Sequence, residues 1–165
     1  MRYVLLLSIL FFGACSSTLN SSKIKTVDTK EIHLTTIRWG SDDLQEIAQK
    51  IVQDILSSSS IDFSKTYSFK KIKNDSHDQI DTKLLSNKIV TALVQSDKVK
   101  ISENKNHQID GFFYGKISSI FKKNATTKDM YFDFGLSLTE VKTTKVVWSG
   151  NVEIRKVYKK ELFGW

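Results

Sequence analysis

The sequence has 165 residues, which is enough for one compact domain and too few for two. Its 40% hydrophobic and 26% charged residues are ordinary for a globular protein, and the absence of proline excludes a stiff proline-rich spacer. The net charge of +7 favours an acidic partner (anionic lipid, a cell-wall polymer or an acidic protein face), with a merely solvated basic surface as the alternative. The lysines are dispersed and lack the arginine and aromatic clusters of nucleic-acid modules, so nucleic acid is not an expected partner.

Residues 1–14 have the pattern of a secretory signal peptide. Arg2 is followed by an apolar run, Tyr3 to Phe12, which is too short to span a bilayer of roughly 30 Å as a helix. Gly13 and Ala14 are small residues placed directly before Cys15, and this pattern resembles the bacterial lipobox. An ordinary signal peptide or an uncleaved anchor is the alternative. Cys15 is the only cysteine and has no partner for an intramolecular disulfide, so we expect cleavage before Cys15 and attachment of lipid, palmitate included, to its thiol.

Residues 15–36 are polar, contain serine pairs and show no apolar period, so they predict a flexible tether behind the lipidated cysteine. Some 20 residues reach at most ~70 Å when extended and ~25 Å on average as a coil. The folded domain is expected over residues 37–165.

Two helices are expected near the start of this domain. Ser41 can cap the first, Asp42 and Asp43 oppose the helix dipole, and the serines at 57–60 end it. Its apolar residues recur three and four apart: Leu44, Ile47, Ala48, Ile51, Val52, Ile55 and Leu56. Asp81 can cap the second helix, whose expected apolar face consists of Leu84, Leu85, Ile89, Ala92 and Leu93.

The remaining periodic segments predict strands. Tyr67–Ile72 alternates weakly and precedes a polar loop over Lys73–Ile80, and Val99–Ser102 is a short strand. Three longer strands follow around residues 112–120, 130–141 and 146–157, the last two joined by a glycine-free turn at 142–145. They predict an antiparallel meander with one face covered by the helices. The expected fold class is α/β, more narrowly α+β, with a small antiparallel sheet of about four strands flanked by helices.

Catalytic and metal-binding patterns are missing from the sequence. The three histidines are isolated from other metal ligands, and neither a G-x-S-x-G nor an S-x-x-K motif occurs; the histidines are His33, His77 and His107. The aspartates between residues 75 and 81 invite a calcium interpretation, but the loop glycine and the final glutamate of an EF-hand are lacking. Turns and a helix cap are the favoured roles for Asp75, Asp78 and Asp81. We therefore expect no enzyme activity, no catalytic residue, no metal and no cofactor.

Five segments follow one another behind the lipobox-like pattern: Ser41–Leu44, Ile80–Ser96, Gly115–Ile120, Trp148–Arg155 and Phe163–Trp165. Together and in this order they resemble the LpoB family of penicillin-binding protein activators, and the resemblance covers about Ile37 to Trp165. Two features differ from the family pattern: only Glu103–Asp110 connects the Val99 strand to the strand containing Gly115, and the tether is short.

The resemblance implies a domain similar to the amino-terminal domain of TolB and a protein that catalyses nothing itself. It implies a lipoprotein of the outer membrane, facing the periplasm, that binds a class A penicillin-binding protein, stimulates it and so regulates peptidoglycan synthesis. Ser16 after the cysteine resembles the sorting pattern for outer-membrane delivery. We expect a monomer. The positions of the motifs suggest a partner-binding surface at Asn74, Asp75, His77, Asp78, Asp81 and Thr82, with a solvated turn as the alternative. The alternative function is a cell-envelope lipoprotein with a different protein or ligand partner.

Overall fold

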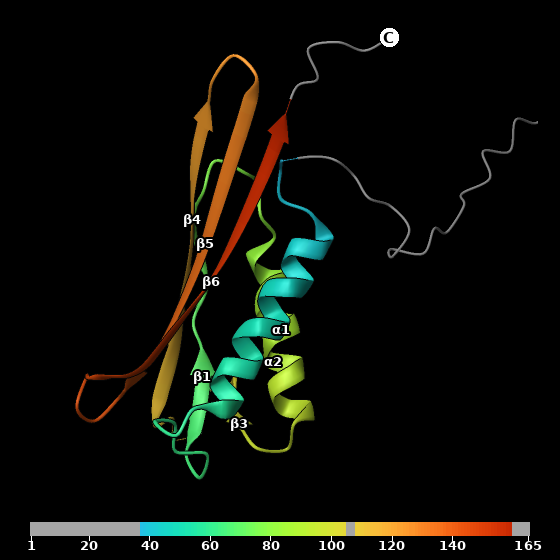
Figure 1. Ribbon diagram of the computed structural model, residues 1–165. Coiled ribbons are helices and arrows are strands. Elements are labelled where there is room, and N and C mark those ends of the chain that lie inside the picture. The colour runs from blue at the N-terminus through green and yellow to red at the C-terminus, as the bar shows by residue number, and fades with distance from the viewer. Residues whose placement is uncertain (1–36, 105–107, 160–165) are drawn as a thin grey trace, which may run out of the picture. The chain divides into compact units, whose positions relative to one another are not determined.

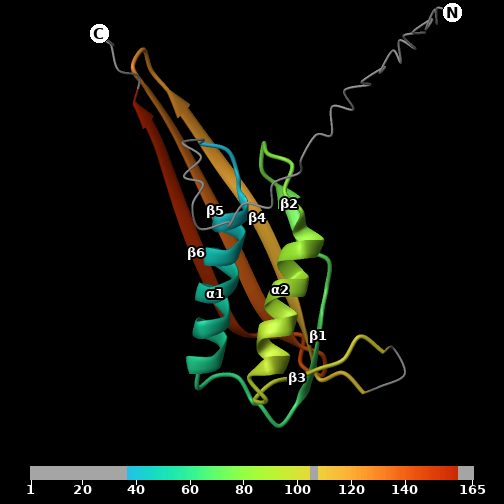
Figure 2. The same ribbon diagram turned by 90° about the vertical axis from the view of Figure 1, so that its right-hand side faces the viewer.

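The computed structural model describes residues 37–104 and 108–159. The predicted signal peptide, Cys15, the tether and the closing Phe163–Trp165 segment lie outside these residues. Residues 35–165 form one compact unit, which contains both helices and all six strands of the described chain. This unit has two layers, with the two helices side by side on one face of the sheet (Figures 1 and 2). It therefore has a core of its own.

The sheet is mixed. Its strands run in the order β3-β1-β4-β5-β6, and β2 pairs with β4 beyond the end of β1. The bounds are β1 Thr66–Phe69, β2 Lys73–Asp75, β3 Lys100–Ile101, β4 Gly111–Lys123, β5 Thr127–Glu140 and β6 Val146–Lys159. The predicted antiparallel meander is confirmed in β4, β5 and β6. The expectation of about four strands, all antiparallel, is wrong, because β1 and β2 run parallel to β4. The helix Thr82–Gln95, which lies between β2 and β4 in the chain, is a crossover connection, so that β4 runs in the same direction as β1 and β2.

A one-residue bulge separates β1 from β2. Phe69 pairs with Phe113 and Lys73 pairs with Lys116, so the edge strand has one residue more than β4 over this interval. The bulge shifts the alternation of side chains: Tyr67 faces the core in β1, and Ile72, only 2% exposed, faces it after the bulge. The predicted strand over Tyr67–Ile72 is thus divided in two, and part of the predicted polar loop forms a strand.

The helices α1 (Ser41–Ser57) and α2 (Thr82–Gln95) begin with different caps. The prediction that Ser41 caps α1 is wrong, because Gly40 is the cap and the Asp43 carboxylate accepts its N–H at 2.7 Å. That carboxylate also forms an ion pair with Lys156 of β6, which joins the helix to the sheet. The predicted Asp81 cap of α2 is confirmed, since its carboxylate accepts the Leu84 N–H at 2.8 Å.

The core lies between the helices and alternate residues of β4, β5 and β6. Every residue of the predicted helical stripe on α1 is buried except Leu56, which is partly buried. On α2 the buried residues are Leu85, Ile89 and Leu93. The prediction fails for Leu84, which is 45% exposed and lies to the side of this buried row. The sheet contributes Phe113, Ile117, Met130, Phe132, Phe134, Leu136, Leu138, Trp148, Val152 and Ile154. The opposite face of these strands has no helix on it within the described chain.

Candidate protein-binding site

The predicted partner-binding residues lie in one short stretch from β2 to the start of α2, and their role in binding a partner stays a prediction. Asn74 lies in β2, and its Nδ2 donates to the carbonyl oxygen of Asp78 at 2.9 Å, across the turn that follows the strand. The His77 N–H donates to Ser119 Oγ at 3.0 Å, so the turn is attached to β4. Asp75 lies in strand β2 and not in a turn, as the sequence had suggested.

Two of the remaining predicted residues support the fold. Asp78 accepts the backbone N–H of Trp39 at 2.8 Å and so holds the start of the domain against the turn. Asp81 caps α2, and Thr82 is the first residue of that helix. His77 is exposed, as expected for a surface histidine. These contacts account for Asp78 and Asp81 without a partner.

Asp75 connects the turn to a larger surface that the sequence analysis missed. Its carboxylate lies 3.0 Å from Lys73 Nζ and 3.1 Å from Lys116 Nζ, and hydrogen bonds from both lysines lower the pKa of Asp75. Lys116 belongs to the helix-free face of the meander, which we call the open face. Its central residues are Tyr114, Lys116, Tyr131, Asp133, Asn151 and Glu153. The open face could have been predicted from the alternation of apolar and polar residues along the strands. The residues between the buried positions of a strand line its other face.

The open face combines exposed apolar side chains with paired polar groups. Tyr114 is 46% exposed and Val147 is 38% exposed. The Tyr131 hydroxyl donates to Glu153 Oε2 at 2.5 Å, and this bond raises the pKa of Tyr131. Arg155 holds Asp129 at 2.7 Å and lowers the pKa of that carboxyl. Cross-strand pairs of this kind fix the directions of the side chains and present a preformed surface.

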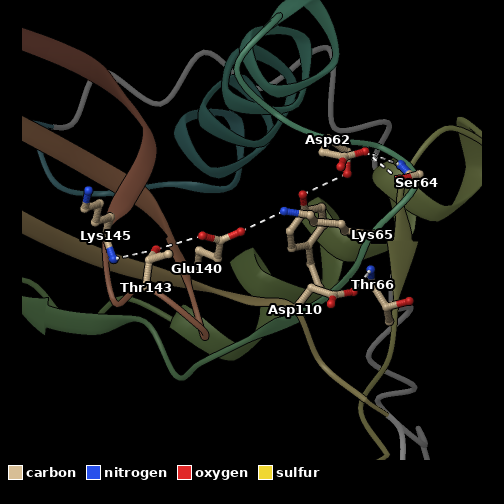
Figure 3. A network of polar contacts seen from close by, with 9 residues as sticks. Asp62, Ser64, Lys65, Thr66, Asp110, Glu140, Thr143 and Lys145 are labelled. Carbon is tan, nitrogen blue, oxygen red and sulfur yellow. Dashed lines mark hydrogen bonds and ion pairs between the residues drawn. The ribbon is translucent and has the colours of Figure 1, made fainter.

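A polar network joins three segments at the other end of the sheet (Figure 3). Lys65 Nζ lies 2.7 Å from Glu140 Oε1, and Thr143 Oγ1 donates to Glu140 Oε2 at 2.7 Å. The hydrogen bond from Lys65 lowers the pKa of Glu140 and raises that of Lys65. The Thr66 N–H donates to Asp110 Oδ2 at 2.9 Å in the same region. The two carboxylates thus accept hydrogen bonds from Lys65, Thr143 and the Thr66 backbone. The network stabilises the position of β1 relative to the β5–β6 turn.

Within residues 37–104 and 108–159, no group of three His, Cys, Asp or Glu side chains is placed to hold a metal ion. The same residues include no helix long and apolar enough to cross a membrane. What the structure presents is a sheet face with tyrosines and paired charges. The fold defines a small α+β domain with two helices on one face of a mixed sheet.

The sequence family follows from comparison with known proteins. The family model described as "Peptidoglycan-synthase activator LpoB" matches residues 43–111 and 110–154. These segments include most of α1, all of α2 and most of the meander, and the chain therefore belongs to the LpoB family. No curated protein sequence matches this chain.

Two solved structures share the fold. The LpoB C-terminal domain from Salmonella enterica has 12% sequence identity and a TM-score of 0.50, and the match covers 68% of this chain and 98% of that one. The LpoB C-terminal domain from Escherichia coli has 13% identity and a TM-score of 0.50 over the same shares. The expected similarity to TolB stays a prediction.

Proposed function

We propose that this protein binds a class A penicillin-binding protein and stimulates its polymerisation and cross-linking of peptidoglycan. The observation that carries the proposal is the family match from residue 43 to residue 154, since the family is one of peptidoglycan-synthase activators. Lipid on Cys15 would hold the protein on the outer membrane, with the domain in the periplasm. The protein would act as a monomer and without a cofactor.

The open face is the surface best suited to the synthase. Tyrosine is enriched among residues that dominate binding energy, because its ring buries a large area at a small cost in side-chain entropy. Tyr114 presents its ring to solvent, and Tyr131 is held in place through its hydrogen bond to Glu153. Side chains that are already ordered lose less freedom on binding. The exposed hydrophobic residues Leu84 and Val94 on α2 lie on the other side of the domain and provide a comparison surface.

Activation requires only differential affinity. A binding module stimulates an enzyme when it binds the active conformation more tightly than the inactive one, and it contributes no reacting group. A sheet face whose side chains are held by cross-strand contacts is suited to this task, because ordered side chains favour one arrangement of the partner. The coupling expected of such effectors is about 5–150-fold.

The test uses residues 16–165, purified and added to a class A synthase from the same cell. Glycan polymerisation is followed with a fluorescent lipid-linked precursor, and cross-linking is followed from the digested product. We expect both rates to rise with a saturable dependence on the added protein. No stimulation of a demonstrably active synthase would overturn the proposal.

A pair of matched variants locates the surface. Tyr114→Ser with Tyr131→Ser removes the two rings of the open face, and we expect synthase affinity to fall at least about tenfold. Leu84→Ser with Val94→Ser removes two exposed apolar side chains from α2 and should leave affinity within about twofold. If the α2 variant loses affinity and the open-face variant keeps it, the synthase binds at the helices. That result would refute the open face as the binding surface but not the proposed activation of the synthase.

A further inference from the structure

The β4–β5 hairpin and the end of β6 project beyond the helices (Figure 1). We call residues Ile120–Lys128 and Val157–Lys159 the basic tip. Within the described residues no helix covers either face of the sheet here, and its apolar side chains are exposed to solvent: Ile120 is 58% exposed, Val157 is 47% exposed, and Phe121 and Tyr158 are each 43% exposed. By the strand registers, Ile120 and Val157 lie on the open face, whereas Phe121 and Tyr158 lie on the opposite face. The tip therefore presents two exposed apolar side chains on each face, and such side chains gathered at one end of a sheet are a sign of an interaction site.

The charge of the domain is also concentrated at the tip. The tip contains four lysines and no acidic residue among its twelve residues; the lysines are Lys122, Lys123, Lys128 and Lys159. The described chain as a whole has 19 basic and 15 acidic residues, so the tip accounts for the whole excess. The next residue of β5, Asp129, is engaged by Arg155 at 2.7 Å. The Lys128 ammonium lies 5.8 Å from the centre of the Tyr158 ring, so cation and aromatic ring share one surface.

The tip is also the end at which the preceding chain joins the domain. Ile37 and Arg38 line a hollow of about 680 Å³ together with Phe121, Lys128 and Tyr158. The 36 residues before Ile37, including Cys15, are therefore attached beside the tip. A membrane anchor in that segment would therefore be connected to the domain at this end.

We propose that the basic tip is a docking surface for a bilayer that contains anionic phospholipid. Lysines near an anionic leaflet gain from its negative surface potential, while phenylalanine and tyrosine rings are favourable at the level of the headgroups. A soluble anionic polymer would explain the lysines but not the four exposed apolar residues among them. The docking does not depend on the lipid of Cys15 or on the synthase, because the groups that carry it all belong to the folded unit.

The experiment measures binding of residues 16–165, which lack Cys15, to vesicles. Vesicles of phosphatidylcholine with phosphatidylglycerol should bind the protein, and vesicles of phosphatidylcholine alone should bind it far less. Each lysine near an anionic surface strengthens binding about fivefold, so changing Lys122, Lys123 and Lys128 to Gln should weaken it about 100-fold. The control changes Lys98, Lys142 and Lys145 to Gln at the other end of the domain, with the same loss of charge and an expected effect below about threefold.

A probe in the tip separates lipid from soluble polymer. The form without Cys15 has no cysteine, so Asn124→Cys can be labelled at a single site with an environment-sensitive dye. The dye should move to a less polar environment on anionic vesicles, whereas the same dye at Thr143→Cys in the β5–β6 turn should not. Equal binding of the tip variant and the wild type, equal loss in the control variant, or a shift at Thr143 alone would overturn the proposal. Tip-dependent binding to soluble polyanions without a dye shift on vesicles would overturn it in favour of a polymer.

Discussion

Gly115 is the position at which the bulge of the edge strand is pressed against the meander. A Cβ atom added to Gly115 would lie 2.8 Å from Cγ1 of Ile72 and 3.3 Å from side-chain atoms of Leu136 and Phe134. All three neighbours are almost completely buried. Ile72 has little room to move, because the bulge between β1 and β2 places its backbone. The change Gly115→Ala should therefore displace the bulge and β2 with it.

The magnitude follows from two opposing terms. Overpacking of a well-filled core costs about 1–3 kcal/mol. Alanine also reduces the entropy of the unfolded chain, which stabilises the folded state by about 0.4–1 kcal/mol. The net loss in free energy of unfolding should be about 1–2 kcal/mol. Urea denaturation, followed by the fluorescence of the tryptophans, measures it.

Gly135 is the matched control. It lies in β5 on the open face and pairs with Lys116, and a Cβ atom added there would have no neighbouring atom within 4 Å. Gly135→Ala changes the unfolded chain in the same way without meeting a neighbour, so its unfolding free energy should stay level or rise by up to about 1 kcal/mol. Equal destabilisation by the two changes, or none by Gly115→Ala, would refute the packing argument.

Three further predictions concern stability. Asp43→Ala removes both the Gly40 cap and the ion pair with Lys156 and should cost about 2–3 kcal/mol in urea denaturation, whereas Asp43→Asn, which retains an acceptor for the cap, should cost less. Thr144 has a φ of 56°, so Thr144→Gly should raise the free energy of unfolding by about 0.5–1 kcal/mol, and a thermal melt that shows no rise would contradict this. Hydrogen bonds from cations lower the pKa of Asp75 and Asp129 from 3.8 and that of Glu140 from 4.5, so the folded-state pKa values lie below the unfolded ones. These carboxylates therefore stabilise the folded state above their unfolded-state pKa values, and this stabilisation is lost as pH falls through their folded-state pKa values. The midpoint of urea denaturation should fall in that acidic range, and less steeply in high salt. A midpoint that rises there would refute the proposed role of these ion pairs.

Elements with strong periodicity were predictable from sequence. The stripe on α1 and the alternation around Phe132, Phe134 and Leu136 depend on local spacing, and both appear in the structure. Strand β2 was not predictable, because its three exposed residues have no alternation and form a strand only through pairing with β4. The cap of α1 was also missed, because Asp43 takes part in a contact with Lys156, which is 113 residues away in sequence.

In the candidate site too, roles that depend on neighbouring residues were predictable, and contacts between residues far apart in sequence were not. The sequence correctly indicated that Asp81 caps a helix, since that role depends on the next three residues. It did not indicate that Asp75 lies beside Lys116, because the parallel pairing of β2 with β4 creates that contact. The open face had a local signature in the odd-numbered residues of β5. Its extent depends on which face the helices cover, and no local pattern specifies that choice.

The predicted tether and the proposed basic tip bear on the proposed function together. A tether of some 20 residues would keep the domain within about 70 Å of an anchor at Cys15, and docking through the tip would hold it at the bilayer itself. The open face runs along the sheet away from the tip, so it would point sideways from the membrane and not into it. A synthase that binds there must come close to the same leaflet. The proposed function on the outer membrane therefore requires a synthase whose contact region extends to that membrane. An inner-membrane anchor would place this domain beside a synthase in the same bilayer, and fractionation of the two membranes distinguishes these arrangements.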